Sequence, residues 1–191
     1  MATGTKEALA AALRQMMTVN PIDKVTVKDI VEICGVNRHT LYYHFDDVDY
    51  LLEWVFEQDS DRVFPQEVVY NHWMEDMMNY FDYLVSNSAF TLNVYNSNSR
   101  LYMLRYLKAR MAACIRSFAE IASEGKNIVR QDFEFVVEFY ANCAIGFISQ
   151  WMDMGMQFPK EITRERILRV MDQSIENILG RFTSPKYRPS Y

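Results

Sequence analysis

The chain has 191 residues, half of them hydrophobic, with a net charge of -5 and a pI of about 5.3. Such a composition can fill a core unaided, and its acidic balance argues against a protein that coats nucleic acid by bulk electrostatics. Cys34, Cys114 and Cys143 are widely spaced, so neither disulfides nor structural zinc is expected. Because no signal segment or long apolar run is present, we expect a soluble, cytoplasmic protein.

Helical spacing of apolar residues runs through the chain, with few prolines and glycines. This pattern predicts an all-α fold of about nine helices, in which three short N-terminal helices precede a bundle of longer ones. The first helix should begin near Thr5 and end at Asn20-Pro21. Its predicted buried residues are Ala8, Leu9, Ala12, Leu13 and Met16.

The second and third helices are predicted from their end signals. Thr26 can cap the second helix, and Asp29 stands where a capping box prefers the longer Glu, so we expect a partial box. Near Cys34 this helix should end, because Gly35 can adopt positive φ. Asn37 is a good cap for a short third helix over residues 38–44.

Two short helices joined by a glycine turn predict a helix-turn-helix, whose second helix lies in the DNA major groove. Leu41 and Phe45 are four positions apart and should face the core. The other third-helix side chains can donate to phosphates or base edges, and backbone amides near Thr26 and Asn37 add anion sites. A Tyr-Tyr-His-Phe run taken alone more often packs than binds DNA, but the turn before it favours DNA contact. His39 and His44 are five positions apart and lack a third ligand, which argues against a metal site.

The remaining helices follow from their apolar spacing. Asp46 or Asp47 can cap a fourth helix that ends before Pro65. The others are expected near residues 69–84, 90–95, 100–123, 131–154 and 162–182.

Three segments carry a family resemblance: Thr26-Val27-Lys28-Asp29-Ile30, Gly35-Val36-Asn37-Arg38 and Thr40-Leu41-Tyr42-Tyr43-His44-Phe45. Together they resemble the DNA-binding signature of TetR-type transcriptional regulators, in register over residues 5–52. Residues 42–45, Trp54-Val55-Phe56 and Gly146-Phe147-Ile148 through Trp151 are similar to the subgroup of dihydroxyacetone-kinase regulators.

The resemblance implies a DNA-binding domain over residues 1–50, an effector-binding and dimerisation domain over 51–185, and a tail over 186–191. It implies that Thr26 and Lys28 approach phosphates and that Arg38 and His39 approach bases. The residues implied to hold the DNA backbone are Thr40, Tyr42, Tyr43 and His44. The candidate DNA-binding residues are Thr26, Lys28, Asn37, Arg38, His39, Thr40, Tyr42, Tyr43 and His44.

One position departs from the family pattern. Where the family often has a lysine at the start of the fourth helix, this chain has Val48 between Asp47 and Asp49, with Asp46 just before them. Five basic residues in positions 1–50 face seven acidic ones. We therefore expect weaker non-specific DNA binding, and a shallower salt dependence, than for a basic relative.

Aromatic and methionine residues in the C-terminal part are either core filling or the lining of an effector cavity. The candidate ligand-binding residues are Trp73, Met77, Tyr80, Tyr102, Met103, Tyr106 and Phe118. The helix over 131–154 is apolar almost all round and needs cover on both sides, which a two-fold interface with the last helix would supply. The candidate dimer residues are Ala141, Ala144, Ile145, Ile148, Trp151, Ile167, Met171, Ile175 and Ile178.

The expected function is sequence-specific regulation of transcription by a homodimer on a pseudo-palindromic operator, with an effector that is a small molecule or a partner protein. Repression is the expected sign. The alternative is a helical ligand- or protein-binding module without operator binding, which the acidic N-terminal part supports. We expect neither an enzyme nor a cofactor, because no nucleophile and base pair, phosphate loop or metal spacing is present.

Overall fold

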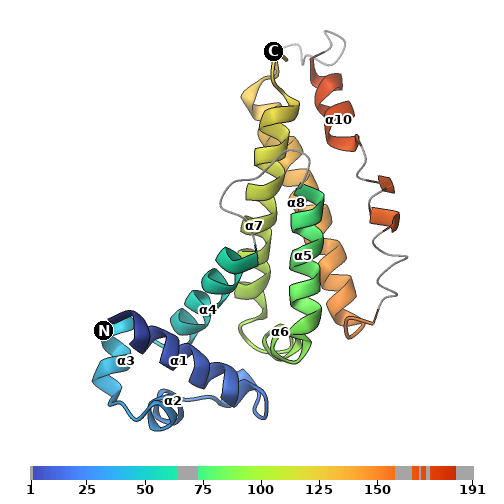
Figure 1. Ribbon diagram of the computed structural model, residues 1–191. Helices are drawn as coiled ribbons and strands as arrows, with labels where there is room; N and C mark the ends of the chain where they lie inside the picture. Colours follow the sequence, from blue (N-terminus) through green and yellow to red (C-terminus); the bar gives the residue numbers. More distant parts are fainter. Residues whose placement is uncertain (1, 64–72, 158–164, 168, 171–172, 184–191) are drawn as a thin grey trace. The chain divides into compact units, whose positions relative to one another are not determined.

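The computed structural model describes residues 2–63, 73–157, 165–167, 169–170 and 173–183. Over these residues every regular element is helical, as predicted (Figure 1). The elements are α1 (Ala2–Met17), the 3-10 helix η1 (Ile22–Lys24), α2 (Val27–Cys34), α3 (Arg38–His44), α4 (Val48–Val63), α5 (Trp73–Ser86), α6 (Ser88–Tyr95), α7 (Arg100–Ala122), α8 (Arg130–Asp153) and α10 (Ser174–Phe182). None of the helices in this described part is long and apolar enough to cross a membrane.

Packing divides the chain into two compact units. Unit 1 comprises Met1–Pro65 and Tyr80–Met103, and unit 2 comprises Gln66–Asn79 and Leu104–Tyr191. Helices α5 and α7 each contribute residues to both units. The boundaries expected after residues 50 and 185 separate functional domains, which these packing units do not test, so they stay predictions.

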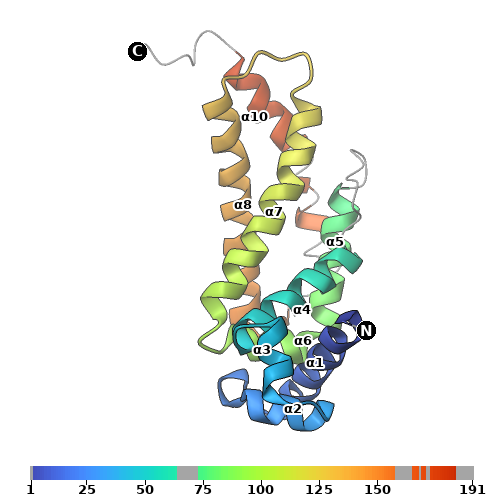
Figure 2. The same ribbon diagram turned by 90° about the vertical axis from the view of Figure 1, so that its left-hand side faces the viewer.

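In unit 1, α1 packs against α2, α4 and α6 (Figure 2). Leu9, Ala12 and Leu13 are buried as predicted, whereas Ala8 is exposed and Met16 is only half-buried. The helix begins at Ala2, so the expected cap at Thr5 was wrong. Other fully buried side chains of this unit include Ile30, Leu41, Leu51, Leu52 and Val94.

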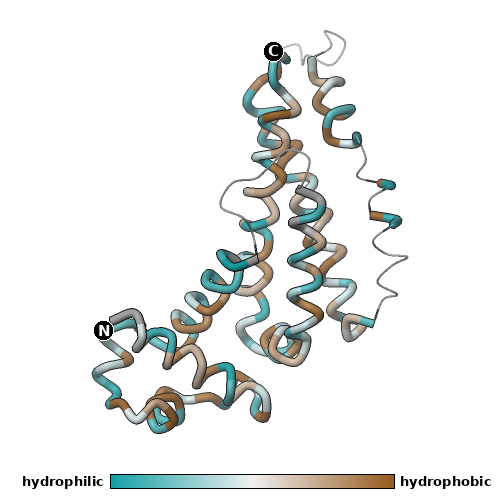
Figure 3. The backbone as a smooth tube through the Cα atoms, in the orientation of Figure 1, coloured by the Kyte–Doolittle hydropathy of each residue, from teal (hydrophilic) through white to brown (hydrophobic). Residues whose placement is uncertain are grey.

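In unit 2, α10 packs on α8. Its buried side chains include Met111, Ile115, Phe118, Val137 and Ala141, all from α7 and α8. Figure 3 shows hydrophobic and hydrophilic positions interspersed along the helices. The all-α fold was predicted from the helical spacing of the apolar positions.

The last predicted helix, over residues 162–182, is not continuous. Gln173 has φ 53° and ψ 9°, a left-handed conformation that breaks a right-handed helix. Helix α10 begins at the next residue, Ser174, and runs to Phe182. A non-glycine residue in this conformation cannot be recognised from apolar spacing, which explains the error.

Candidate nucleic-acid interface

The start of α2 is fixed by a complete capping box. The hydroxyl oxygen of Thr26 accepts a hydrogen bond from the Asp29 amide at 3.3 Å, and the Asp29 carboxylate accepts one from the Thr26 amide at 3.0 Å. The expectation of a partial box was therefore wrong, because the shorter Asp side chain reaches back. Hydrogen bonds from the Thr26 hydroxyl and amide lower the pKa of Asp29.

The turn between α2 and α3 has the predicted chemistry. Gly35 has φ 66°, and the following amide of Val36 donates to the Val31 carbonyl at 3.1 Å. The side-chain oxygen of Asn37 then accepts from the Thr40 amide at 2.9 Å and the Thr40 hydroxyl at 3.0 Å. These bonds cap α3 and use the Asn37 oxygen within the protein, so direct DNA contact by Asn37 and Thr40 stays a prediction.

Helix α3 has one buried and one exposed face, as the sequence predicts. Leu41 is fully buried and Phe45 is buried against the edge of Trp54, with ring centroids 6.0 Å apart. On the opposite face, Tyr43 is 83% exposed and Tyr42 is 53% exposed. Arg38 and His39 are also exposed, and His44 is half-buried.

The exposed face of α3 carries side chains that can bind DNA. Arginine forks onto guanine, imidazole contacts bases or phosphates, and tyrosine hydroxyls donate to phosphates. Exposed Lys28 lies in the first turn of α2, 3.9 Å from Glu32, a distance at which an exposed pair is weak. The hydrogen-bonded cap at Asn37 and the buried anchors Leu41 and Phe45 fix the orientation of this face.

Several acidic residues of the N-terminal region have structural partners. Asp29 completes the capping box, and the Asp47 carboxylate accepts from the Tyr50 amide at 3.0 Å at the start of α4. Asp49 accepts from the Ser99 hydroxyl at 2.9 Å, and Asp23 accepts from the Asn98 amide at 3.1 Å. The acidic residues of this region thus serve helix capping, which the sequence predicted for Asp29 and Asp47, and long-range bonding by Asp49 and Asp23, which it did not reveal.

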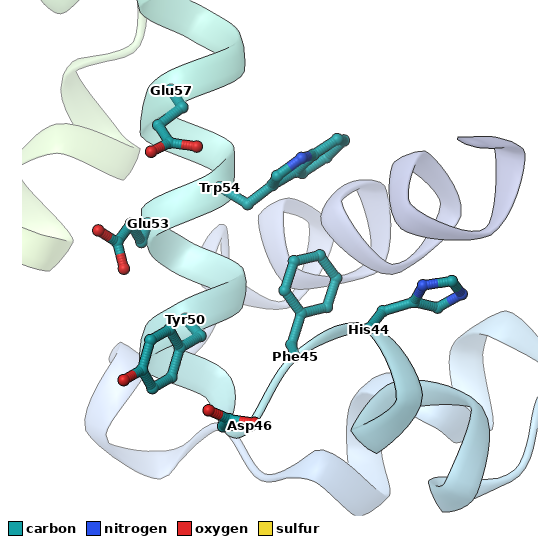
Figure 4. Close-up of a pocket in the computed structure, with 7 residues that line it drawn as sticks. All are labelled: His44, Phe45, Asp46, Tyr50, Glu53, Trp54 and Glu57. Carbon is teal, nitrogen blue, oxygen red and sulfur yellow. The ribbon is translucent and has the colours of Figure 1, made fainter. Parts of the chain in front are cut away.

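A cavity of about 250 Å³ lies behind the end of α3 (Figure 4). The Nζ atom of Lys6 lies 5.3 Å from the ring centroid of Phe45 and 6.0 Å from that of Trp54. The ammonium group of Lys6 therefore makes cation–π contacts with the rings of Phe45 and Trp54. The cavity is lined by His44, Phe45, Asp46, Tyr50, Glu53, Trp54 and Glu57.

A buried polar cluster that the sequence did not reveal joins three helices of unit 1. The carboxylate of Asp59, which is 4% exposed, accepts hydrogen bonds from the guanidinium of Arg14 and the hydroxyl of Tyr83. Burial, with the hydrogen bond to Asp59, raises the pKa of Tyr83 above its usual range. The cluster links α1, α4 and α5 by directional bonds.

The candidate ligand-binding residues are divided between the units. Tyr80 and Met103 are buried and Tyr102 is half-buried in unit 1, while Tyr106 is half-buried and Phe118 is buried in unit 2. The side chains of Trp73 and Met77 lie outside the described residues. A cavity of about 290 Å³ in unit 2 is lined by other residues: Phe135, Val136, Phe139, Tyr140, Ile178, Arg181 and Phe182.

The candidate dimer residues fall into two groups. Ala141, Ile148, Trp151 and Ile175 are buried within the chain itself, and their contact with a second copy stays a prediction. Half-buried positions are Ala144, Ile145, Ile167 and Ile178, and Met171 lies outside the described residues.

The exposed face of α8 was not singled out by the sequence. Phe135 is 62% exposed and Phe139 is 49% exposed, and their rings stack with centroids 6.4 Å apart. Asn142, Cys143 and Gly146, which follow along the helix, are exposed as well. Since α8 is apolar almost all round, periodicity could not separate its core face from its exposed face.

Comparisons with known proteins agree with this architecture. Residues 8–54 match the family model of bacterial regulatory proteins, tetR family, and residues 71–173 match a transcriptional regulator C-terminal region. The HTH-type dhaKLM operon transcriptional activator DhaS of Lactococcus lactis subsp. lactis (strain IL1403) is 26% identical over 91 residues, 48% of this chain and 49% of that protein. The match thus spans about half the length of this curated relative.

Two solved structures share the fold. The dihydroxyacetone kinase operon activator DhaS superimposes with a TM-score of 0.69 at 17% identity, covering 94% of this chain and 98% of that one. A tetR-family transcriptional regulator from Streptomyces coelicolor gives a TM-score of 0.57 at 16% identity, covering 98% and 92%. With both family models matched in order along the sequence, the chain belongs to the TetR family of bacterial transcriptional regulators.

Proposed function

We propose that this protein binds a specific DNA operator through α3 and regulates transcription. The observation that carries the proposal is the two-faced α3, on which Leu41 and Phe45 are buried while Arg38, Tyr42 and Tyr43 project into solvent. Exposed aromatic and basic side chains on a rigidly capped helix suit insertion into a major groove.

Selection of bound sequences from random duplex DNA by the full chain supplies an operator with which to test the proposal. Arg38→Ala and Tyr42→Ala should then each weaken operator binding by about tenfold, because they remove a base or a phosphate contact. Exposed Gln15 on α1 offers a matched control, and Gln15→Ala should bind like the unmodified protein. Unchanged affinity in both α3 variants would remove the proposal.

We also propose that the protein acts as a homodimer through the exposed face of α8. Phe135 and Phe139 form a stacked apolar surface, and together with Ile178 and Phe182 they line the cavity of unit 2. Exposed apolar patches of this kind mark association sites, and a two-fold axis through them would present two recognition helices to an inverted repeat. Sedimentation should show a dimer that Phe139→Glu converts to a monomer, and a monomeric unmodified protein at micromolar concentration would contradict this.

The sign of regulation has two candidates. Repression is the sign expected by default, whereas the relative from L. lactis is named an activator. A reporter gene placed behind the selected operator separates the two: deleting the regulator raises expression under repression and lowers it under activation.

An effector is proposed to bind the C-terminal part and to shift the protein between states of different operator affinity. Half-buried Tyr106 and buried Phe118 of unit 2 belong to the candidate set. A compound that releases the operator from the unmodified protein should lose this effect in Tyr106→Ala. If no DNA sequence is enriched but a ligand binds, the alternative of a ligand-binding module without operator binding holds.

A further inference from the structure

The side-chain amide of Asn93, on α6, hydrogen-bonds through both its nitrogen and its oxygen to the backbone between the end of α1 and η1. Its Nδ2 donates to the carbonyl of Met17 at 2.8 Å and to the carbonyl of Asn20 at 2.7 Å. Its Oδ1 accepts from the amide of Ile22 at 2.9 Å. One side chain from more than 70 residues away thus holds three backbone groups.

These backbone groups need a partner. Met17 is the last residue of α1, and the final carbonyls of a helix have no intrahelical donor. The Ile22 amide opens η1, and the Ile22 side chain is 4% exposed. Asn93 therefore caps the end of α1 and at the same time fixes where η1 begins.

A second bond from the same segment holds η1. The Asp23 carboxylate accepts from the Asn98 amide at 3.1 Å, just beyond the end of α6. Residues 93–98 therefore hydrogen-bond to the α1–α2 connection through both Asn93 and Asn98, and α6 also packs against α1. Any displacement of α6 must break these bonds or carry η1 with it.

The connection that Asn93 fixes leads directly into α2. Two residues after η1 comes Thr26, the cap of α2, and Lys28 follows in its first turn. Both are candidate phosphate contacts. A change in the path of residues 18–25 would therefore shift the start of α2, and α2 packs against α3.

We propose that Asn93 is a positioning residue for operator binding, which sets the placement of α2 and α3 from outside the N-terminal family match. This inference rests on the proposed function, because it assumes that α2 and α3 meet DNA. Asn93 itself would make no DNA contact. Its effect should therefore fall on sequence-specific binding, which depends on register, and spare non-specific binding, which depends on phosphate charge.

The test compares Asn93→Asp with Asn96→Asp, using the selected operator and a random duplex of equal length. A carboxylate at position 93 can still accept from Ile22, but it cannot donate to the two carbonyls. Asn96 is exposed at the end of α6 and receives the same added charge, so it controls for repulsion of DNA. We expect Asn93→Asp to raise the operator Kd by about tenfold over Asn96→Asp, with equal random-duplex affinity in the two variants. Circular dichroism at the assay temperature shows that each is folded.

A second variant keeps the test decisive if Asn93→Asp does not fold. Asp23→Ala removes the bond to Asn98 at an exposed position, and we expect operator affinity to fall about threefold. Losing a negative charge would by itself tighten DNA binding, so this fall would oppose the electrostatic trend.

Two results would overturn the inference in different ways. If the unmodified protein enriches no sequence from random DNA, the proposed function fails and this inference fails with it. If the protein has an operator, but folded Asn93→Asp and Asn96→Asp keep equal ratios of operator to random-duplex affinity, Asn93 has no positioning role. If Asn93→Asp does not fold, and folded Asp23→Ala keeps the ratio of the unmodified protein, the bonds from segment 93–98 to η1 do not position α2 and α3, and the inference fails.

Discussion

Each of the two units is stabilised internally by a different kind of contact. In unit 1, the buried carboxylate of Asp59 binds the half-buried side chains of Arg14 and Tyr83, and Asn93 binds three backbone groups. In unit 2 the described ion pairs between α7 and α8 lie on partly exposed side chains: Arg116 with Glu134 at 2.6 Å, and Lys108 with Glu138 at 2.8 Å. The interior of unit 2 is formed by apolar side chains such as Met111 and Phe118.

This difference matches the demands on each unit. Hydrogen bonds are directional, so a buried polar network specifies one arrangement of helices, as reading a base sequence requires. Apolar contacts are less directional, and methionine-rich packing adapts to a change in shape. An apolar interior therefore suits the effector-binding or dimerisation role proposed for the C-terminal part, and a polar network suits the DNA-binding role proposed for the N-terminal part.

The largest expected effect is the loss of the buried carboxylate. Asp59→Ala leaves the half-buried side chains of Arg14 and Tyr83 without their buried acceptor. We expect the free energy of unfolding to fall by about 3 kcal/mol or more. Glu134→Gln in unit 2, which weakens a partly exposed pair, should cost under about 1 kcal/mol. Chemical denaturation at one fixed protein concentration compares them, and equal losses would contradict the proposed difference between the units.

A smaller loss is expected from the anchor of α3. Leu41 is fully buried, so Leu41→Ala should lower the free energy of unfolding by about 2 to 3 kcal/mol. Leu101, which is 59% exposed in the same unit, provides the control, and Leu101→Ala should change it by less than about 0.5 kcal/mol. Thermal denaturation of the two variants side by side measures the difference. A Leu41→Ala protein as stable as Leu101→Ala would mean that α3 is not anchored by this side chain.

The cap of α2 should have a smaller effect again. Thr26→Ala removes the oxygen that accepts from the Asp29 amide, and such a loss costs about 1 kcal/mol. Thr18, whose hydroxyl donates to the Gln15 carbonyl at an exposed site, serves as the control. Urea denaturation should show a loss in Thr26→Ala that exceeds the loss in Thr18→Ala, and the reverse order would count against the capping box.

The pH dependence of Asp29 is the smallest expected effect. Its pKa lies below the ordinary value of 3.8 in the folded protein, because it accepts bonds from Thr26. Its contribution to stability is therefore complete above pH 3.8 and is lost as the pH falls through the lower folded value. The difference in stability between the unmodified protein and Asp29→Ala should shrink in acid, and a difference that grows there would have the wrong sign.

Helices α2 and α3 could be predicted because their end signals are local. Thr26, Gly35 and Asn37 act on groups within five residues of themselves, so α2 and α3 were predicted with their observed ends. The partners of Asp59 and Asn93 lie 24 to 76 residues away and leave no periodic trace. They could not be found from spacing alone.

For the C-terminal helices, the sequence did not predict which faces are buried or where the last helix is broken. Helix α8 is apolar almost all round, so the sequence predicted a second cover without distinguishing buried Ala141 from exposed Phe139. The break before α10 depends on the left-handed backbone conformation of Gln173, which the residue type does not indicate. Fold class is recoverable from such segments, whereas the assignment of faces depends on packing.

We propose that the exposed face of α3 reads DNA, and the motifs selected from random DNA by the full chain and by Arg38→Ala test this. We expect an inverted repeat for the unmodified protein. For Arg38→Ala we expect the same repeat with base preference lost at one symmetric pair of positions, because one side chain in each protomer would contact them. An identical motif bound with unchanged affinity by both proteins would contradict the account.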